Sequence, residues 1–251
     1  MTSTPDATDA TRKTTFVTLV LDETGSMQSI KDDVIGGYNA YVKTLRESGQ
    51  DYLFTLIKFD SNHHDVVHRG VPLSEVPDLT NETYQPGSST PLIDVCVKAI
   101  KATEEKVEAG MQVALVIQTD GQENASTEYT NADLVQLIKE KTSAGWLILF
   151  LGAGIDAFDQ ATKMGIGPQY TLSNTRATSG VACAAAGTQV NAYAKSGLRA
   201  DAAWTQEQRM STGGSMPPAG GDDATVPPEP VVPQPAATTS KSAPIVDEIK
   251  I

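Results

Sequence analysis

The sequence predicts an α/β fold in which an open, mostly parallel sheet carries helices on both faces. Two continuous apolar runs, residues 16–22 (FVTLVLD) and 111–120 (MQVALVIQTD), have strand length, which is typical of strands buried on both faces. Segments with helical periodicity follow both strands. Two further strands, at 52–60 and 65–71, are close enough to form a hairpin and add one antiparallel edge strand. The predicted architecture is a doubly wound, Rossmann-like sheet.

The first half of the chain is predicted to hold one helix, the hairpin and a second helix. Ser29 followed by Asp32 matches a helix-start box, and apolar residues then recur at helical spacing. After the hairpin, a proline-containing loop ends at Thr90. Thr90 is a suitable N-cap for the helix predicted over 91–110, because its hydroxyl can accept a hydrogen bond from the first turn.

The second half continues the alternation of strands and helices. After the strand at 111–120, the pattern predicts a helix, a strand, a short helix, a short strand and a final helix, at 132–144, 146–154, 156–165, 169–173 and 177–200. We therefore place one folded domain at 14–205. The polar residues 1–13 are expected to be a disordered N-terminal segment. Residues 206–251, which hold eight of the 14 prolines, are expected to be a disordered tail.

Composition and charge exclude several classes of partner. The chain has 31 acidic and 19 basic residues and a net charge of -12, which argues against nucleic acid or an anionic membrane as a partner. No apolar stretch approaches the length of a membrane span, and the first residues lack the apolar region of a signal peptide. Cys96 and Cys183 lie in helical patterns, where free cysteines act as apolar fillers. We expect a cytoplasmic protein.

Oxygen-bearing side chains gather where the predicted strands end. Asp22, Thr24 and Ser26 alternate directly after the first strand, around a tight glycine turn. Thr90 and Asp120 begin two other loops that this topology brings to the same edge of the sheet. Any one of these residues alone is typical of a turn or a helix cap. Together they offer five oxygen side chains, which are the ligands that hard cations such as Mg²⁺ and Ca²⁺ take.

Three segments carry a family resemblance. DETGSM (22–27), GSSTPLID (87–94) and TDGQEN (119–124) resemble, in order and spacing, the metal-site segments of the von Willebrand factor A domain family, and the resemblance extends over roughly residues 15–200. Asp22, Ser26, Thr90 and Asp120 match that family's pattern, and Thr24 replaces the usual middle serine while keeping its hydroxyl. The resemblance implies a metal-ion-dependent adhesion site for Mg²⁺, or Mn²⁺ or Ca²⁺. One coordination position would remain for the carboxylate of a partner.

The expected function is therefore a non-enzymatic protein-binding module that grips an Asp or Glu of a partner through the bound ion. Two alternatives stay open. The chain could be the adaptor subunit of an AAA-type ATPase machine, a role in which such domains recur. It could also be a metal-dependent hydrolase, which would need a general base close to the ion. Glu23 and Glu123 are the nearby candidates for that base.

Two other motifs suggest rival sites. GAGIDA (152–157) fits G-x-G-x-x-A, but it comes late in the chain and lacks the acid about 20 residues on, so we interpret it as a tight turn. His63, His64 and His68 raise the possibility of zinc. We expect them to form a solvated hairpin near the amino ends of the central strands, away from the oxygen-rich loops. No nucleophile elbow or phosphate-binding loop is present in the sequence.

Overall fold

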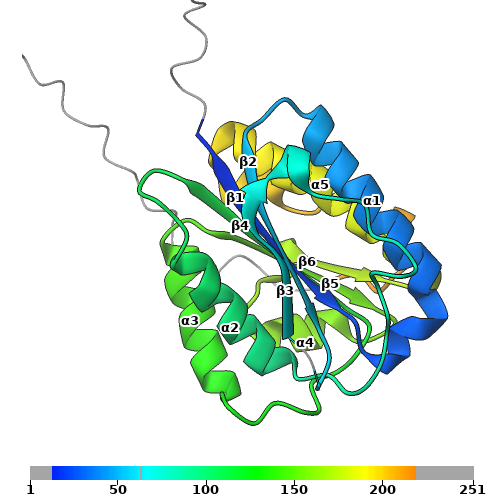
Figure 1. The fold of residues 1–251 in the computed structure, drawn as a ribbon. Helices are drawn as coiled ribbons and strands as arrows, with labels where there is room; N and C mark the ends of the chain where they lie inside the picture. Colours follow the sequence, from blue (N-terminus) through cyan, green and yellow to red (C-terminus); the bar gives the residue numbers. More distant parts are fainter. Residues whose placement is uncertain (1–12, 63, 219–251) are drawn as a thin grey trace, which may run out of the picture.

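The computed structural model describes residues 13–62 and 64–218, and Figure 1 shows a central sheet with helices on both faces. The six strands are arranged in the order β3-β2-β1-β4-β5-β6. Their bounds are Thr15–Asp22 (β1), Tyr52–Phe59 (β2), His64–Pro72 (β3), Gln112–Thr119 (β4), Leu147–Ala153 (β5) and Thr171–Asn174 (β6). All neighbours pair in parallel except β2 and β3, which are antiparallel. The predicted fold class, with its antiparallel edge strand, is confirmed.

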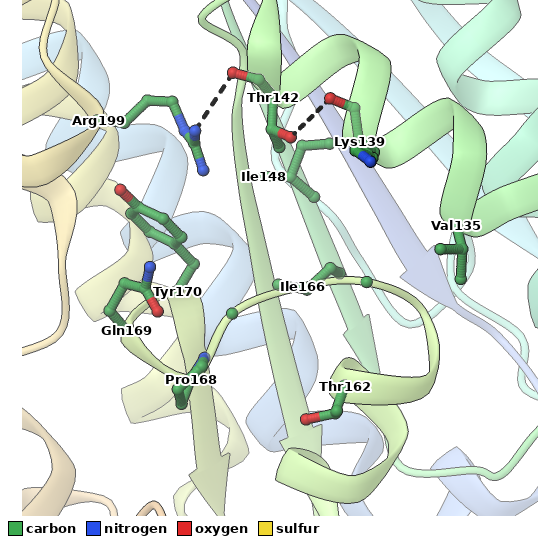
Figure 2. A pocket seen from close by; sticks show the side chains of 12 residues that line it. Val135, Lys139, Thr142, Ile148, Thr162, Ile166, Pro168, Gln169, Tyr170 and Arg199 are labelled. Atoms are coloured by element: carbon green, nitrogen blue, oxygen red, sulfur yellow. Dashed lines mark hydrogen bonds between the residues drawn. The ribbon is translucent and has the colours of Figure 1, made fainter. Parts of the chain in front are cut away.

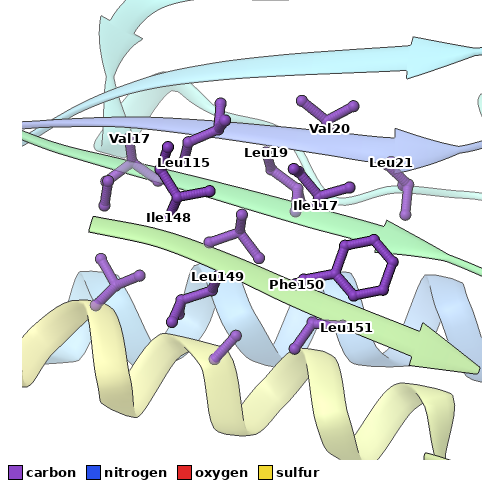
Figure 3. Packing of buried hydrophobic residues seen from close by; sticks show 14 of the residues in the cluster. Val17, Leu19, Val20, Leu21, Leu115, Ile117, Ile148, Leu149, Phe150 and Leu151 are labelled. Carbon is purple, nitrogen blue, oxygen red and sulfur yellow. The ribbon is translucent and has the colours of Figure 1, made fainter. Parts of the chain in front are cut away.

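The neighbouring strands β1, β4 and β5 form the centre of the hydrophobic core. Every residue of β1, β4 and β5 is buried, which is why these strands read as continuous apolar runs in the sequence. Their side chains pack against one another and against the flanking helices (Figure 3). The register places Asp22 at the end of β1 beside Phe59 at the end of β2. The last residues of β1, β2 and β4 therefore share one edge of the sheet.

Helices cover both faces of this sheet (Figure 1). The helices α1 (Lys31–Glu47) and α5 (Ser179–Ser196) pack together on one face, and α2 (Leu92–Glu104) and α3 (Asn131–Ser143) lie on the other. The short helix α4 (Ala157–Lys163) packs against β5 and β6. Cys96 and Cys183 are free and buried, as predicted. Within the described residues, no helix is long and apolar enough to cross a bilayer.

A pair of glycines allows α1 and α5 to approach closely. A Cβ atom on Gly37 of α1 would lie 2.6 Å from the Cα of Gly180 on α5, whereas a Cβ on Gly36 would meet nothing within 4 Å. Gly37 is thus required by close packing, although glycine in a helix interior lowers helix propensity. Gly36 has no such packing role.

Two of the predicted helix caps are wrong. The chain enters α1 through a 3₁₀ turn over Gly25–Ile30, and α1 has no side-chain cap: the Ser29 hydroxyl donates to the Ser26 carbonyl oxygen. The helix α2 begins at Leu92, and its N-cap position also lacks a side-chain hydrogen bond. Thr90 is therefore not the N-cap of α2. Its hydroxyl is left for another role.

The hairpin lies at the opposite edge from the one predicted. Because β2 runs parallel to β1, the turn that follows Phe59 must lie at the same edge as Asp22. The Ser61 hydroxyl in this turn hydrogen-bonds the Ser88 hydroxyl. His63 and the side chain of His64 lie outside the described residues. His68, on β3, has its pKa lowered by partial burial.

The boundary of the predicted C-terminal tail also needs correction. Residues 206–211 form the helix α6 (Gln206–Ser211) instead of belonging to a disordered segment. The buried Arg209 donates to the carbonyl oxygens of Thr171 and Pro168, both at 2.7 Å. The Thr212 hydroxyl donates to the Ser173 carbonyl oxygen at 3.0 Å, which ties the segment to β6. The remainder of the predicted tail from 219, like residues 1–12 of the N-terminal segment, lies outside the described residues.

Candidate functional site

Three loops are joined at the carboxyl edge of the sheet: the first loop (residues 22–26), the second loop (84–91) and the third loop (119–126). The amide of Gly25 donates to the Ser88 carbonyl oxygen at 3.0 Å, and the amide of Gly87 donates to the Glu23 carbonyl oxygen at 2.8 Å. The amide of Asn124 in the third loop donates to the Thr90 carbonyl oxygen at 3.1 Å. Backbone bonds thus hold the second loop between the other two.

The carboxyl group of Asp22 is fixed by donors on both oxygens. Oδ1 accepts from the Thr24 amide at 2.8 Å, and Oδ2 accepts from the Thr119 hydroxyl at 2.5 Å. The Tyr84 hydroxyl donates to the Asp22 carbonyl oxygen at 2.6 Å. Burial raises the pKa of Asp22 from its ordinary value to about 6, although the hydrogen bonds from Thr119 and Thr24 lower it. The group is therefore oriented, but its charge is poorly stabilised.

Two hydroxyls connect the first loop to Asp120 of the third loop. The hydroxyls of Thr24 and Ser26 lie 3.3 Å apart, and the Ser26 hydroxyl donates to Oδ1 of Asp120. The other carboxyl oxygen of Asp120, Oδ2, is buried and accepts no hydrogen bond from any described residue. Its nearest charged partner is a guanidinium nitrogen of Arg176, at 3.3 Å. Burial raises the pKa of Asp120 as well.

Thr90 faces the third loop. It is buried, and a Cβ atom on Gly121 would lie 2.8 Å from its hydroxyl oxygen, so the hydroxyl touches the residue that follows Asp120. The Thr90 amide donates to Oδ1 of Asn124 at 2.9 Å. The structure therefore brings all five predicted residues to one edge of the sheet. Their role as metal ligands stays a prediction.

Both candidate general bases are occupied elsewhere. The Glu23 carboxylate pairs with Lys58 through both oxygens at 2.9 Å. Glu123 accepts from the amides of Ile93 at 2.8 Å and Ala125 at 2.9 Å, among others. Since Ile93 lies in the first turn of α2, the third loop, and not Thr90, caps the start of this helix.

Sequence reasoning missed three residues of this edge. Thr119 is the last residue of an apolar strand, and its position beside Asp120 was its only signal. Tyr84 lies in the second loop, and Arg176 follows β6. Neither belongs to a motif with a fixed spacing from Asp22, so only the fold brings them there.

The donor set suits a hard divalent cation. It consists of two carboxylates and three neutral hydroxyls, all oxygen, as Mg²⁺, Mn²⁺ and Ca²⁺ prefer. The buried Asp120 Oδ2 without a hydrogen bond is the kind of acceptor that an ion would satisfy. Among the described residues, no group of three or more His, Cys, Asp or Glu side chains could hold a metal, so the hydroxyls would be needed.

A separate pocket of about 530 Å³ lies between α3 and the connection from α4 to β6 (Figure 2). Arg199 lines it, donates to the Thr142 carbonyl oxygen at 3.2 Å and lies 4.7 Å from the centre of the Tyr170 ring. None of the five predicted site residues lines this pocket. It is not part of the site at the carboxyl edge.

Comparison with known proteins identifies the fold. No family model and no curated protein sequence matches the chain. Among solved structures, similar chains include the pilus adhesin SpaC from Lactobacillus rhamnosus GG (12% identity, TM-score 0.56, covering 72% of this chain and 30% of that one). The PilB minor pilin from Streptococcus sanguinis is also similar (12%, 0.51, 72% and 62%). So is a von Willebrand factor type A protein from Catenulispora acidiphila (11%, 0.50, 72% and 43%).

These likenesses concern the fold alone, because all three identities are low. The chain spans less than two thirds of the length of each of these proteins. The sheet order and the helices on both faces agree with the architecture predicted from the sequence. The chain therefore has a von Willebrand factor A-like fold.

Proposed function

We propose that this protein is a metal-ion-dependent protein-binding module. It would hold Mg²⁺, or Mn²⁺ or Ca²⁺, on a set of oxygen ligands that comprises Asp22, Thr24, Ser26, Thr90 and Asp120. The partner would be a protein that presents an Asp or Glu to the ion. The observation that carries this proposal is the meeting of two buried carboxylates and three hydroxyls from three loops, where Oδ2 of Asp120 has no hydrogen-bond partner in the described part of the chain.

The residues of the edge have distinct tasks in this proposal. Thr119 and the Thr24 amide orient Asp22, and Ser26 orients Asp120, so the carboxylates need no rearrangement to meet an ion. An ion would supply positive charge to both buried carboxylates, of which Asp120 has only the half-exposed Arg176 beside it. Because the hydroxyl ligands are neutral, two carboxylates do not overneutralise a divalent cation, and a further carboxylate is attracted at short distance.

We propose binding and not hydrolysis. The two acids that could serve as a base, Glu23 and Glu123, have their oxygens engaged by Lys58 and by backbone amides. A hydrolytic base must be free to accept a proton from water. A role as adaptor for an ATPase machine would use the same binding mode. The identity of the captured partner, an ATPase, would distinguish this role. A cytoplasmic location and the exclusion of nucleic acid and membrane partners remain predictions from composition and charge.

Calorimetric titration of Mg²⁺ and Mn²⁺ into metal-free protein tests the site. We expect saturable binding of one ion per chain, and loss of that binding in Asp120→Ala with the fold retained. Asp159→Ala is the matched control, because Asp159 forms an exposed ion pair with Lys163 on α4, outside the three loops. Absence of saturable binding by the wild-type protein at millimolar metal would reject the proposal.

Pull-down from the native host, with and without EDTA, tests the function. We expect a partner protein whose recovery needs the metal and is lost in Asp22→Ala. Changing one Asp or Glu of that partner to Ala should also abolish capture. Capture that is indifferent both to EDTA and to Asp22→Ala would place recognition on another face of the domain.

A further inference from the structure

Arg176 reaches the candidate site from the loop between β6 and α5. Its Nη2 lies 3.3 Å from Oδ2 of Asp120, and its Nη1 donates to the Ser29 hydroxyl at 3.4 Å. The same carboxyl oxygen is the buried one that accepts no hydrogen bond within residues 13–62 and 64–218. The guanidinium thus supplies charge to Asp120 without satisfying it as a donor.

The backbone of Arg176 lies in an anchored turn, while its side chain is half exposed. Thr175 and Thr178 form a capping box around the turn, and the Thr178 hydroxyl donates to the Thr212 carbonyl oxygen at 2.5 Å. The aliphatic stem passes over Gly154, where a Cβ atom would lie 3.3 Å from Cγ of Arg176. The Arg176 side chain is 49% exposed, whereas that of Asp120 is fully buried. The guanidinium can therefore move into solvent without unfolding the turn.

A second cation near these loops is already engaged. Lys58 pairs with both oxygens of Glu23 and donates to the Thr83 carbonyl oxygen at 2.7 Å. Arg176 is thus the side chain that balances Asp120 in the described structure. A divalent ion would deliver its charge to the same carboxylate, and two cations beside one carboxylate repel each other.

We propose that Arg176 is an internal counter-ion that a divalent metal must displace from Asp120. Arg176 then stabilises the metal-free site and raises the metal concentration at which the site fills. This inference rests on the proposed metal site and adds its regulation by a residue outside the three loops. Metal binding would release the guanidinium from Asp120. The position of the Arg176 side chain, in the loop after β6, would therefore differ between the metal-free and the metal-bound protein.

Titration of Mn²⁺ into wild-type protein, Arg176→Gln and Arg176→Lys tests this inference. Removing a half-exposed ion pair should tighten metal binding about two- to fivefold in Arg176→Gln. Arg176→Lys keeps the charge and should remain close to wild type. Lys43→Gln is the control for net charge, because Lys43 pairs with Glu47 in the last turns of α1 and is exposed.

A second measurement distinguishes displacement from a merely structural role. In EDTA, Arg176→Gln should melt below wild type, and saturating Mn²⁺ should remove that difference, because the metal-bound protein no longer uses the ion pair. Equal affinity in wild type and Arg176→Gln, or weaker binding by the variant, would overturn the counter-ion proposal while leaving the metal site intact. No saturable binding by any of the proteins would overturn both.

Discussion

The charge of Asp22 should destabilise the metal-free protein. Burial raises the pKa of this carboxyl to about 6, from an ordinary value of 3.8. Between these two values the folded state binds more protons than the unfolded state, so the free energy of unfolding falls as the pH rises from about 4 to about 6. The difference between the folded pKa of Asp22 and its ordinary value corresponds to a loss of about 3 kcal/mol in the free energy of unfolding at pH 7, as an upper limit. Asp22→Asn removes this penalty.

The substituted amide can keep the local hydrogen bonds. Its oxygen can accept from the Thr24 amide, and its NH₂ can donate to the Thr119 hydroxyl, which has the Gly121 carbonyl oxygen within 3.1 Å as an alternative acceptor. We therefore expect Asp22→Asn without metal to be about 1–3 kcal/mol more stable than wild type at pH 7.5. The difference should vanish near pH 4. Urea denaturation in EDTA across this pH range measures it.

Addition of metal should make wild type more stable than Asp22→Asn. Wild type gains stability from saturating Mg²⁺ by mass action, whereas the variant has lost a ligand and gains little.

Asp94→Asn is a control for which the opposite pH dependence is expected. Burial acts to raise the pKa of Asp94, but the amides of Thr127, Tyr129 and Glu128 bring it below its ordinary value. Asp94→Asn should therefore be destabilising at neutral pH and less so on acidification, below the ordinary carboxyl pKa.

A metal-free Asp22→Asn that is less stable than wild type at pH 7.5 would contradict this prediction. A difference between the two proteins that stays constant from pH 4 to 8 would refute it as well. Either result would mean that the hydrogen bonds to Asp22 outweigh its burial and that the site is organised without an ion.

Three further outcomes are expected. Gly37→Ala should lose about 1–3 kcal/mol of stability because its Cβ would strike the α5 backbone, whereas Gly36→Ala, which meets open space, should gain up to about 1 kcal/mol by denaturant titration. Thr24→Ser should keep metal affinity and Thr24→Ala should weaken it in calorimetry, because only the hydroxyl is a potential ligand. A chain ending at residue 205 should melt about 5–10 °C lower, because α6 is lost, while one ending at 218 should melt within about 2 °C of full length.

The strands were predictable because their physical signal is local. Residues of β1, β4 and β5 are buried on both faces, so the apolar runs in the sequence directly reflect the burial. The edge at which the oxygen-bearing residues meet followed from the parallel topology. The hairpin turn lies at that edge as well, because β2 lies beside β1 in parallel register. The predicted position of the hairpin is wrong because it leaves out this parallel pairing of β2 with β1.

The caps and the charge partners were not predictable from local patterns. Thr90 precedes α2 as an N-cap would, yet Glu123 accepts from the Ile93 amide and the Ser126 hydroxyl accepts from the Asp94 amide. Helix amides can be satisfied by any nearby acceptor, including one some 30 residues away in the chain. The contact between Arg176 and Asp120 depends in the same way on where β6 ends, which no spacing rule encodes.

The local charge of the site differs from what the net charge of -12 suggests. Glu23 adds little negative charge to the edge, because Lys58 meets both of its oxygens at 2.9 Å. Two carboxylates remain, Asp22 and Asp120, and the ion pair from Arg176 reaches only the second. Among the described residues, no cationic side chain pairs with Asp22 in this way, and burial weakens its ionisation. A divalent ion would therefore be attracted most strongly by the unpaired charge of Asp22. Its attraction to Asp120 would be weakened by Arg176 for as long as the guanidinium stays beside that carboxylate.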